Sequence, residues 1–93
     1  MKIEFDPLKN AINFAKHGVY LTKASKLDWD AIVIYEDRRK DYSEARYIGY
    51  APLNIRLYYV IFTVRHEAYR IISLRKANDR ELERYEKTVK TVH

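Results

Sequence analysis

The segment YRIISLRKANDRELERYE, residues 69–86, contains a strand pattern followed directly by a helix start. Its first half is rich in β-branched and aromatic residues, which predicts a strand over residues 69–75. Asn78 is followed three residues later by Glu81, the spacing of a capping box in which each side chain accepts the other residue's backbone N–H. We therefore expect a helix over residues 79–91 immediately after the strand.

Two cations, Arg75 and Lys76, stand at the junction of this strand and helix. The planar guanidinium of Arg75 matches phosphate oxygens, so the junction is the first candidate for an anion-binding site. Adjacent strand residues face opposite ways, so both cations reach one site only if the strand has already ended at Lys76. The alternative is that Arg75 is a strand-end charge paired with Glu36 or Glu81.

The N-terminal part predicts a short edge strand over residues 2–5 and then a helix. Asp6 is suited to the N-cap, Pro7 to the first helical position and Gly18 to the C-terminal stop. The face of this helix that we expect to be buried carries Leu8, Ala11, Ile12 and Ala15. The face that we expect to be polar and exposed carries Lys9, Asn13, Lys16 and His17.

The middle of the chain predicts a second short helix from Thr22, with Ala24 and Leu27 pointing inward, and then three strands. These strands are expected over residues 32–35, 46–51 and 55–64. The last of them is nearly continuous in β-formers, as in a central strand covered on both faces.

Gly49 and the charged run at residues 36–41 give two further predictions for this region. Gly49 predicts a bulge or a close approach of another chain segment. The charged run at residues 36–41 is interpreted as a solvated loop, with direct contact to RNA as the alternative. Together the elements predict an α+β fold, a small antiparallel sheet with two N-terminal helices and one C-terminal helix.

Length and composition limit the classes of protein. The chain has 93 residues, of which 47% are apolar and 14% aromatic. This is enough for a small core and for one domain, so we expect residues 1–93 to form a single domain. The sequence has no apolar run near 18 residues and no signal-like N-terminus, so we expect a soluble cytoplasmic protein that does not span a membrane.

The formal net charge is +5 and the pI about 9.5. Such a charge favours a polyanion or an acidic protein surface as partner, and composition alone does not choose between them. The chain has no cysteine, which excludes disulfides and thiolate metal sites and fits a reducing cytoplasm. Its three histidines are scattered at positions 17, 66 and 93 without metal-binding spacing, so we expect no metal and no cofactor.

Four sequence blocks together resemble the BrnT family of toxins, in the same order along the chain. The blocks are FDPLK at residues 5–9, NFAKHGV at 13–19, SEARYIG at 43–49 and RIISLRKA at 70–77, the last followed by Glu81 and RYE. Phe5 stands where the family usually has Trp.

The resemblance implies a RelE-like fold and a ribonuclease of a type II toxin–antitoxin module that inhibits translation. It also implies a BrnA-like antitoxin with a ribbon-helix-helix DNA-binding part, operator DNA bound only through that antitoxin, and a toxin dimer within a heterotetramer. Lys23 and Ser25 stand in a stretch that is commonly acidic and alanine-rich in the family.

Cleavage of RNA without a metal needs a base for the ribose 2′-hydroxyl, cations for the phosphate and an acid for the departing 5′-oxygen. The ribose supplies the nucleophile, so the absence of a recognisable nucleophile motif is compatible with this reaction. The residues that we predict to be catalytic are Lys16, His17, Arg65, Arg75 and Lys76.

Each of these roles has an alternative. His17 suits proton transfer because its ordinary pKa is near 6.5, but a histidine in the last turn of a helix also caps the helix dipole. Lys16 would assist it electrostatically. Arg65, at the exit of the longest strand and on one face with Thr63, is either a second cation or a hairpin-tip residue without a role.

Four residues are expected to bind RNA or to support the site. Arg70, placed on the face of Ile72 and Leu74, is alternatively a structural ion pair. Ser73 and Glu81 would orient the arginines, and Glu81 also fits a purely capping role. Tyr85 shares an apolar stripe with Leu82 and Val89, so core packing is its ordinary role, with its hydroxyl near the site as the alternative.

Two other functions remain open on this sequence. The chain could be a non-catalytic basic module, derived from such a toxin, that binds RNA or DNA or acts as a co-repressor. It could also be a structural subunit whose charge complements an acidic antitoxin tail.

Overall fold

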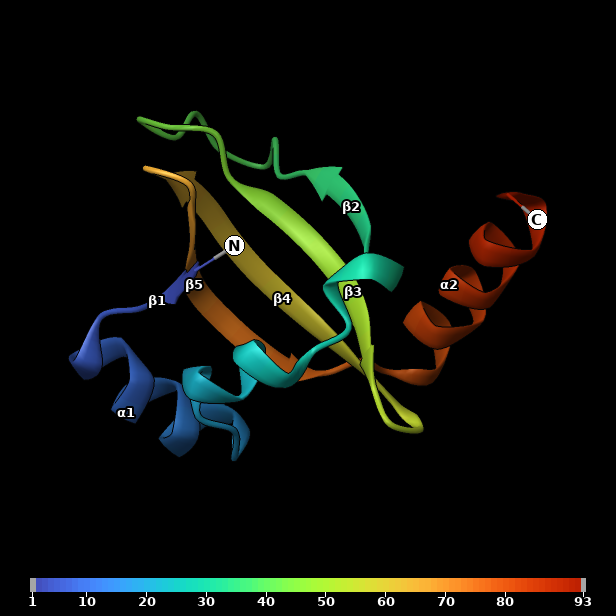
Figure 1. Cartoon of the computed structure of the whole chain (residues 1–93), viewed down its shortest axis with the longest axis horizontal. Helices are drawn as coiled ribbons and strands as arrows, with labels where there is room; N and C mark the ends of the chain where they lie inside the picture. The colour runs from blue at the N-terminus through green and yellow to red at the C-terminus, as the bar shows by residue number, and fades with distance from the viewer. Residues whose placement is uncertain (1, 93) are drawn as a thin grey trace.

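The computed structural model describes the backbone of residues 2–92 and the side chains of residues 2–90, so Met1 and His93 lie outside the described part. Five strands form one sheet in the order β1-β5-β4-β3-β2 (Figure 1). The strands are β1 (Lys2–Glu4), β2 (Val33–Glu36), β3 (Tyr47–Leu53), β4 (Arg56–Arg65) and β5 (Ala68–Lys76). The helical segments are α1 (Pro7–His17), the 3₁₀ segments η1 (Leu21–Lys26) and η2 (Trp29–Ala31), and α2 (Asp79–Val92).

The sheet is mixed, which corrects the prediction of an antiparallel sheet. β2, β3, β4 and β5 pair antiparallel in chain order, but β1 pairs parallel with the start of β5. Between β1 and β5 the chain forms α1, the two 3₁₀ segments and the strands β2 to β4. This connection is long enough for the crossover that a parallel pair needs. The expected edge position of β1 and central position of β4 are confirmed.

A tight hairpin joins β4 and β5. His66 and Glu67 form its two-residue turn with φ of 49° and 64°. Two successive positive φ values match the type I′ turn, whose twist suits the flanking strands.

The predicted second α-helix is wrong in type. The chain forms the short 3₁₀ segments η1 and η2 instead. The expected inward residues are nevertheless correct, since Ala24 is 0% and Leu27 5% exposed. A short segment with few inward positions can be held by packing alone, without the length that a stable α-helix needs.

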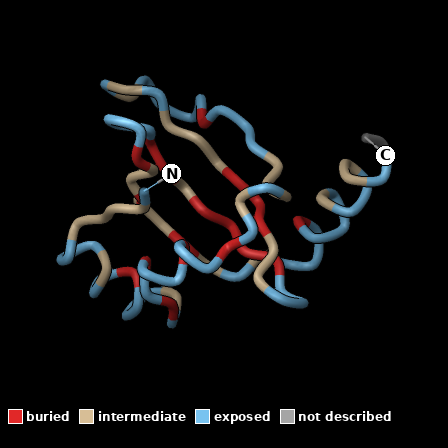
Figure 2. The backbone as a smooth tube through the Cα atoms, viewed as in Figure 1, coloured by how far each residue is buried: buried red, intermediate tan, exposed pale blue. Residues whose placement is uncertain are grey.

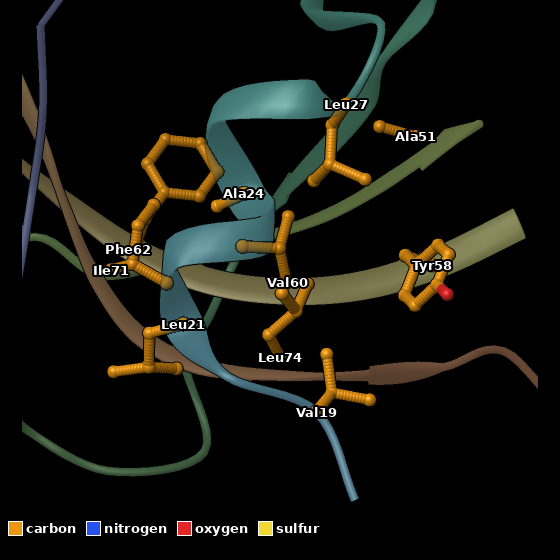
Figure 3. Close-up of a cluster of buried hydrophobic side chains, with 10 residues drawn as sticks. All are labelled: Val19, Leu21, Ala24, Leu27, Ala51, Tyr58, Val60, Phe62, Ile71 and Leu74. Carbon is orange, nitrogen blue, oxygen red and sulfur yellow. The ribbon is translucent and has the colours of Figure 1, made fainter. Parts of the chain in front are cut away.

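One face of the sheet, here called the core face, packs against η1 and the segment before it. Its buried side chains interdigitate in Figure 3. They are Val19, Leu21, Ala24, Leu27, Ala51, Tyr58, Val60, Phe62, Ile71 and Leu74. Gly49 lies on this face, where an added Cβ would come within 2.5 Å of the Ile32 Cδ1 atom. The predicted close approach at Gly49 is therefore confirmed.

The orientation of α1 reverses the prediction. Asp6 caps it and Gly18 ends it at φ 72°, as expected, but Leu8 and Ile12 are 69% and 55% exposed, and Ala11 and Ala15 are exposed as well. The buried residue is Asn13, predicted to be on the exposed face.

Asn13 is buried because it completes the hydrogen bonds of the sheet edge. β1 pairs only with residues 68–70, which leaves the later part of β5 unpaired on that side. The Asn13 amide donates to the Leu74 carbonyl at 2.7 Å and its oxygen accepts the Leu74 N–H at 3.2 Å. It also donates to the Val19 carbonyl at 2.8 Å. Backbone groups at a buried edge need such partners, and this need overrides the apolar pattern of the helix.

The other face of the sheet, here called the arginine face, carries Tyr59, Ile61 and Thr63 of β4. The residues directly opposite them on β5 are Arg75, Ser73 and Arg70. The register shifts between Ile61 and Phe62, where Ile72 is the extra residue of β5. This bulge moves Arg70 to the face opposite Leu74, which corrects the prediction that the two share a face.

α2 follows β5 after two residues and extends away from the sheet (Figure 1). The predicted capping box is confirmed, because Glu81 N–H donates to Asn78 Oδ1 at 2.8 Å and Asn78 N–H to Glu81 Oε1 at 2.9 Å. Beyond its first turns most of α2 is exposed (Figure 2), and Leu82 is 40% exposed.

Candidate functional site

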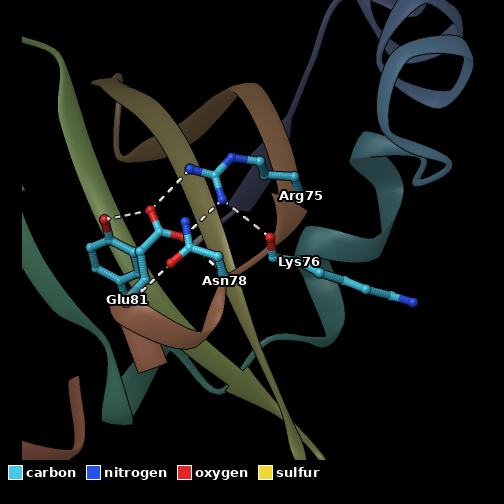
Figure 4. A network of polar contacts seen from close by, with 5 residues as sticks. Arg75, Lys76, Asn78 and Glu81 are labelled. Atoms are coloured by element: carbon cyan, nitrogen blue, oxygen red, sulfur yellow. Dashed lines mark hydrogen bonds and ion pairs between the residues drawn. The ribbon is translucent and has the colours of Figure 1, made fainter. Parts of the chain in front are cut away.

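Arg75 is fixed on the arginine face by a nearly buried carboxylate (Figure 4). Its two terminal nitrogens donate to Glu81 Oε1 at 2.8 Å and Oε2 at 3.0 Å, and one of them also donates to the Lys76 carbonyl at 3.1 Å. The guanidinium lies over the Tyr59 ring, 3.8 Å from its centroid. A planar cation with two carboxylate bonds and one stacked face has little freedom to reorient.

Glu81 connects this arginine to α2 and to β3. Besides Arg75 and the Asn78 N–H, its carboxylate accepts the Tyr50 hydroxyl at 3.1 Å. The hydrogen bond from Arg75 is the main reason that the pKa of Glu81 falls to about 2. Burial, with the adjacent Glu81 charge, raises the pKa of Tyr50 to about 12. Glu81 therefore both caps α2 and orients Arg75, so its two predicted roles coincide.

Lys76 points away from Arg75, as Figure 4 shows. β5 continues through Lys76, whose partner Tyr58 belongs to the core face, whereas Arg75 lies opposite Tyr59. The condition for both cations to reach one site is therefore not met. Lys76 therefore lies on the opposite face of the sheet from Arg75.

His17 and Lys16 lie at the β5 edge near Ser73. Both line a cavity of about 190 Å³ between α1 and the bulge of β5, together with Ser73. Burial, followed by the positive charges of Lys16 and Arg75, lowers the pKa of His17 below 6.5. Arg75 does not line this cavity, but it lies on β5 two residues beyond Ser73, on the same face.

The remaining predicted cations are already paired. Arg65 donates to both carboxylate oxygens of Glu44, with the guanidinium Nε at 3.1 Å and 3.0 Å from them. Arg70 pairs with Glu4 across the β1–β5 ladder at 3.6 Å. Arg70 thus fits its structural alternative, and Arg65 lies opposite Ala68 at the far end of the arginine face.

Tyr85 has a structural contact as well. Its hydroxyl donates to the Ala31 carbonyl at 2.8 Å, and its ring packs against the cluster of Tyr50, Leu57 and Tyr59. This contact ties α2 to η2, in agreement with the packing role expected from its apolar stripe.

Sequence reasoning missed Tyr50 and Tyr59, which contact the two members of the Arg75–Glu81 pair. Tyr50, Tyr59 and Arg75 occupy one row across three strands. Only the register places them together, and no spacing along the chain signals it. The alternation of side chains along β4 predicts only that Tyr59 and Thr63 share a face. It does not reveal that Tyr59 lies opposite Arg75.

Two searches of the described residues found nothing. The described residues contain no group of three or more His, Cys, Asp and Glu side chains that could hold a metal ion. Among the described helices none is long and apolar enough to cross a membrane.

Comparison with known proteins agrees with the sequence blocks. A search of curated proteins found no match. The family model described as "Ribonuclease toxin, BrnT, of type II toxin-antitoxin system" matches residues 5–81, a span that includes His17, Arg75 and Glu81. The chain therefore belongs to the BrnT family of ribonuclease toxins of type II toxin–antitoxin systems.

Proposed function

We propose that this toxin is a metal-independent endoribonuclease whose active site is the edge of the arginine face, where Arg75, His17 and Lys16 meet. Membership of the family gives the class, a ribonuclease toxin with an RNA substrate and an antitoxin partner. The observation that carries the proposal is the cavity that His17 and Lys16 line with Ser73, two residues along β5 from the guanidinium fixed by Glu81.

The chemistry follows from these three side chains. Neutral His17 takes the proton of a ribose 2′-hydroxyl, and the 2′-oxygen attacks the adjacent phosphorus. The bond from phosphorus to the 5′-oxygen breaks, which leaves a 2′,3′-cyclic phosphate and a 5′-hydroxyl. Arg75 stabilises the charge that builds on the phosphate, and the Lys16 ammonium supplies charge and a proton at the departing 5′-oxygen.

The biological setting is part of the same proposal. In it the toxin acts in the cytoplasm as a single RelE-like domain and stops translation by cutting RNA. A BrnA-like antitoxin with a ribbon-helix-helix part binds a toxin dimer in a heterotetramer and carries the complex to operator DNA. The resemblance of the four sequence blocks supports these points.

The test is incubation of the purified, antitoxin-free chain with RNA in the presence of EDTA. We expect products ending in 2′,3′-cyclic phosphate, and a rate about 10²–10⁴-fold lower for His17→Gln, as for loss of a general base. Arg75→Ala should also lose activity, whereas its neighbour Lys76→Ala, on the core face, should not. His66→Asn, in the exposed hairpin turn, is the matched control for the histidine.

The pH dependence of kcat/KM gives a second readout of His17. A general base acts unprotonated, and the pKa of His17 lies below 6.5. We expect a plateau at neutral pH and a fall on the acid side below pH 6.5, absent in the residual activity of His17→Gln. RNA binding that weakens with salt but yields no products would instead support the non-catalytic binding module.

A further inference from the structure

A second arginine on the arginine face is fixed in the same manner as Arg75. Arg39 donates from Nε to Asp37 Oδ1 and from a terminal nitrogen to Asp37 Oδ2, both at 2.8 Å. The Arg39 backbone N–H and the Tyr42 hydroxyl also donate to this carboxylate, at 3.2 Å each. The Asp37 side chain is 0% exposed, and these bonds hold its pKa far below the ordinary range.

Asp37 continues the alternation of β2. Val33 and Tyr35 lie opposite Tyr50 and Ile48, on the arginine face. The Asp37 N–H donates to the Arg46 carbonyl at 2.7 Å, which extends the ladder by one position. The Asp37 side chain therefore lies on the same face, and it holds the Arg39 guanidinium there.

Arg39 keeps unused hydrogen-bond donors. A guanidinium has five N–H groups. The Asp37 carboxylate accepts two of those of Arg39, which leaves three for another partner. Its side chain is 61% exposed. Burial of a charged carboxylate is costly unless it is paired, so Asp37 keeps this arginine in place while the outward edge of the guanidinium stays available.

We propose that Arg39 is a second phosphate-binding residue, so that one RNA strand crosses the arginine face over Tyr59 with neighbouring phosphates on Arg39 and Arg75. This inference rests on the proposed function, because it assigns the path of the same substrate. On this face Tyr59 lies beneath the Arg75 guanidinium, in the row that Tyr50 and Val33 continue towards β2, the strand after which Arg39 is held. In this proposal Arg39 contacts RNA, which is the alternative considered for the charged run at residues 36–41.

The experiment measures binding of a 2′-O-methyl RNA oligonucleotide, which lacks the attacking hydroxyl, over a series of salt concentrations. The double variant Asp37→Asn, Arg39→Gln removes one charge of each sign and so keeps the formal net charge. We expect about a tenfold loss of affinity, as for a charged hydrogen-bonded contact. The slope of log affinity against log salt should become shallower by about 0.7, the value for one phosphate contact in a single strand.

The chain offers a matched control in the neighbouring pair. Arg38 and Glu36 form an ion pair at 3.3 Å, with side chains 81% and 47% exposed. The double variant Glu36→Gln, Arg38→Gln makes the same change of charge one residue away, and its affinity and salt slope should equal those of the parent chain. Equal losses in both double variants would overturn the assignment to Arg39.

A second measurement needs no variant and so does not depend on folding. Phenylglyoxal modifies arginines, and mass spectrometry follows each site with and without saturating oligonucleotide. We expect modification of Arg39 to slow severalfold in the complex and that of Arg38 to stay the same. An unchanged rate at Arg39 would overturn the inference.

Failure of the inference and failure of the proposed function give different results. If the parent chain cuts ordinary RNA but binds the oligonucleotide no better than the Asp37→Asn, Arg39→Gln variant, the inference fails and the nuclease stands. If the parent chain neither cuts RNA nor binds the oligonucleotide, both fail.

Discussion

The two faces of the sheet are built from the same strands by different chemistry. On the core face, Val60 and Leu74 are 0% and Phe62 1% exposed, and their neighbours are apolar. On the arginine face the strands bury Thr63 beside Tyr50, Leu57 and Tyr59, and the buried carboxylates Asp37 and Glu81 come from segments outside the strands. Alternation along each strand separates the two sets, so neighbouring residues in sequence serve different purposes.

The difference lies in what holds each face together. The core face is stabilised by removal of apolar surface from water, which is nondirectional and tolerates rearrangement. The arginine face has a smaller apolar cluster, on which paired charges and directional hydrogen bonds fix the side chains of Arg75 and Glu81. A small domain can thus bury its larger apolar core on one face and hold rigid cations on the other.

Phe62→Ala should show the largest effect on stability. The ring is buried among Trp29, Tyr47 and Tyr69, so its removal leaves a cavity. We expect a loss of about 3–5 kcal/mol in the free energy of unfolding. Urea denaturation measures it, with Ile61→Ala on the other face as the control, expected to cost about 1–2 kcal/mol. Equal costs would remove the distinction between the faces.

Glu81→Gln should show the next largest effect, and it should depend on pH. The folded-state pKa of Glu81 is about 2, below the ordinary 4.5, so its charge stabilises the fold above pH 4.5. This contribution, up to about 3 kcal/mol, is lost as the pH falls from 4.5 towards 2.

The measurement is urea denaturation at a series of pH values. Glu81→Gln should lose stability at neutral pH and flatten the acid dependence between pH 4.5 and 2. The control Glu83→Gln, with a side chain 70% exposed, should change neither. A parent-like acid dependence in Glu81→Gln would contradict the role given to the Arg75 pair.

Asn13→Ala should cost about 1–3 kcal/mol, because it leaves the buried backbone groups of Leu74 and the Val19 carbonyl without their partner. Hydrogen exchange should show the same loss locally, as faster exchange of the Leu74 amide. No change at Leu74 would mean that α1 does not complete the sheet edge.

Ile12→Ala should have the smallest effect, within about 0.5 kcal/mol, because the side chain is 55% exposed and alanine favours a helix. Thermal or urea unfolding of this variant beside Asn13→Ala tests the orientation of α1 directly. A larger cost for Ile12→Ala than for Asn13→Ala would restore the orientation expected from the apolar pattern.

Local signals were sufficient for much of the fold. The Asp6 cap, the Gly18 stop and the Asn78–Glu81 capping box lie within a few residues of the groups that they bind, so short spacings reveal them. The edge position of β1, the central position of β4 and the approach at Gly49 also followed from pattern. The type of the second helix did not, because packing rather than length holds that segment.

The candidate site divides in the same way. Sequence blocks alone determined the family, and they pointed to residues 70–77 and His17 as the candidate site. The tertiary structure decided which cations share a face, since one bulge near Ile72 and the continuation of β5 through Lys76 set those directions. It also brought Tyr59 beneath Arg75 and turned Asn13 inward. The physical reason is that strand register and edge hydrogen bonds join residues distant in sequence, and no local spacing records which partner each strand will meet.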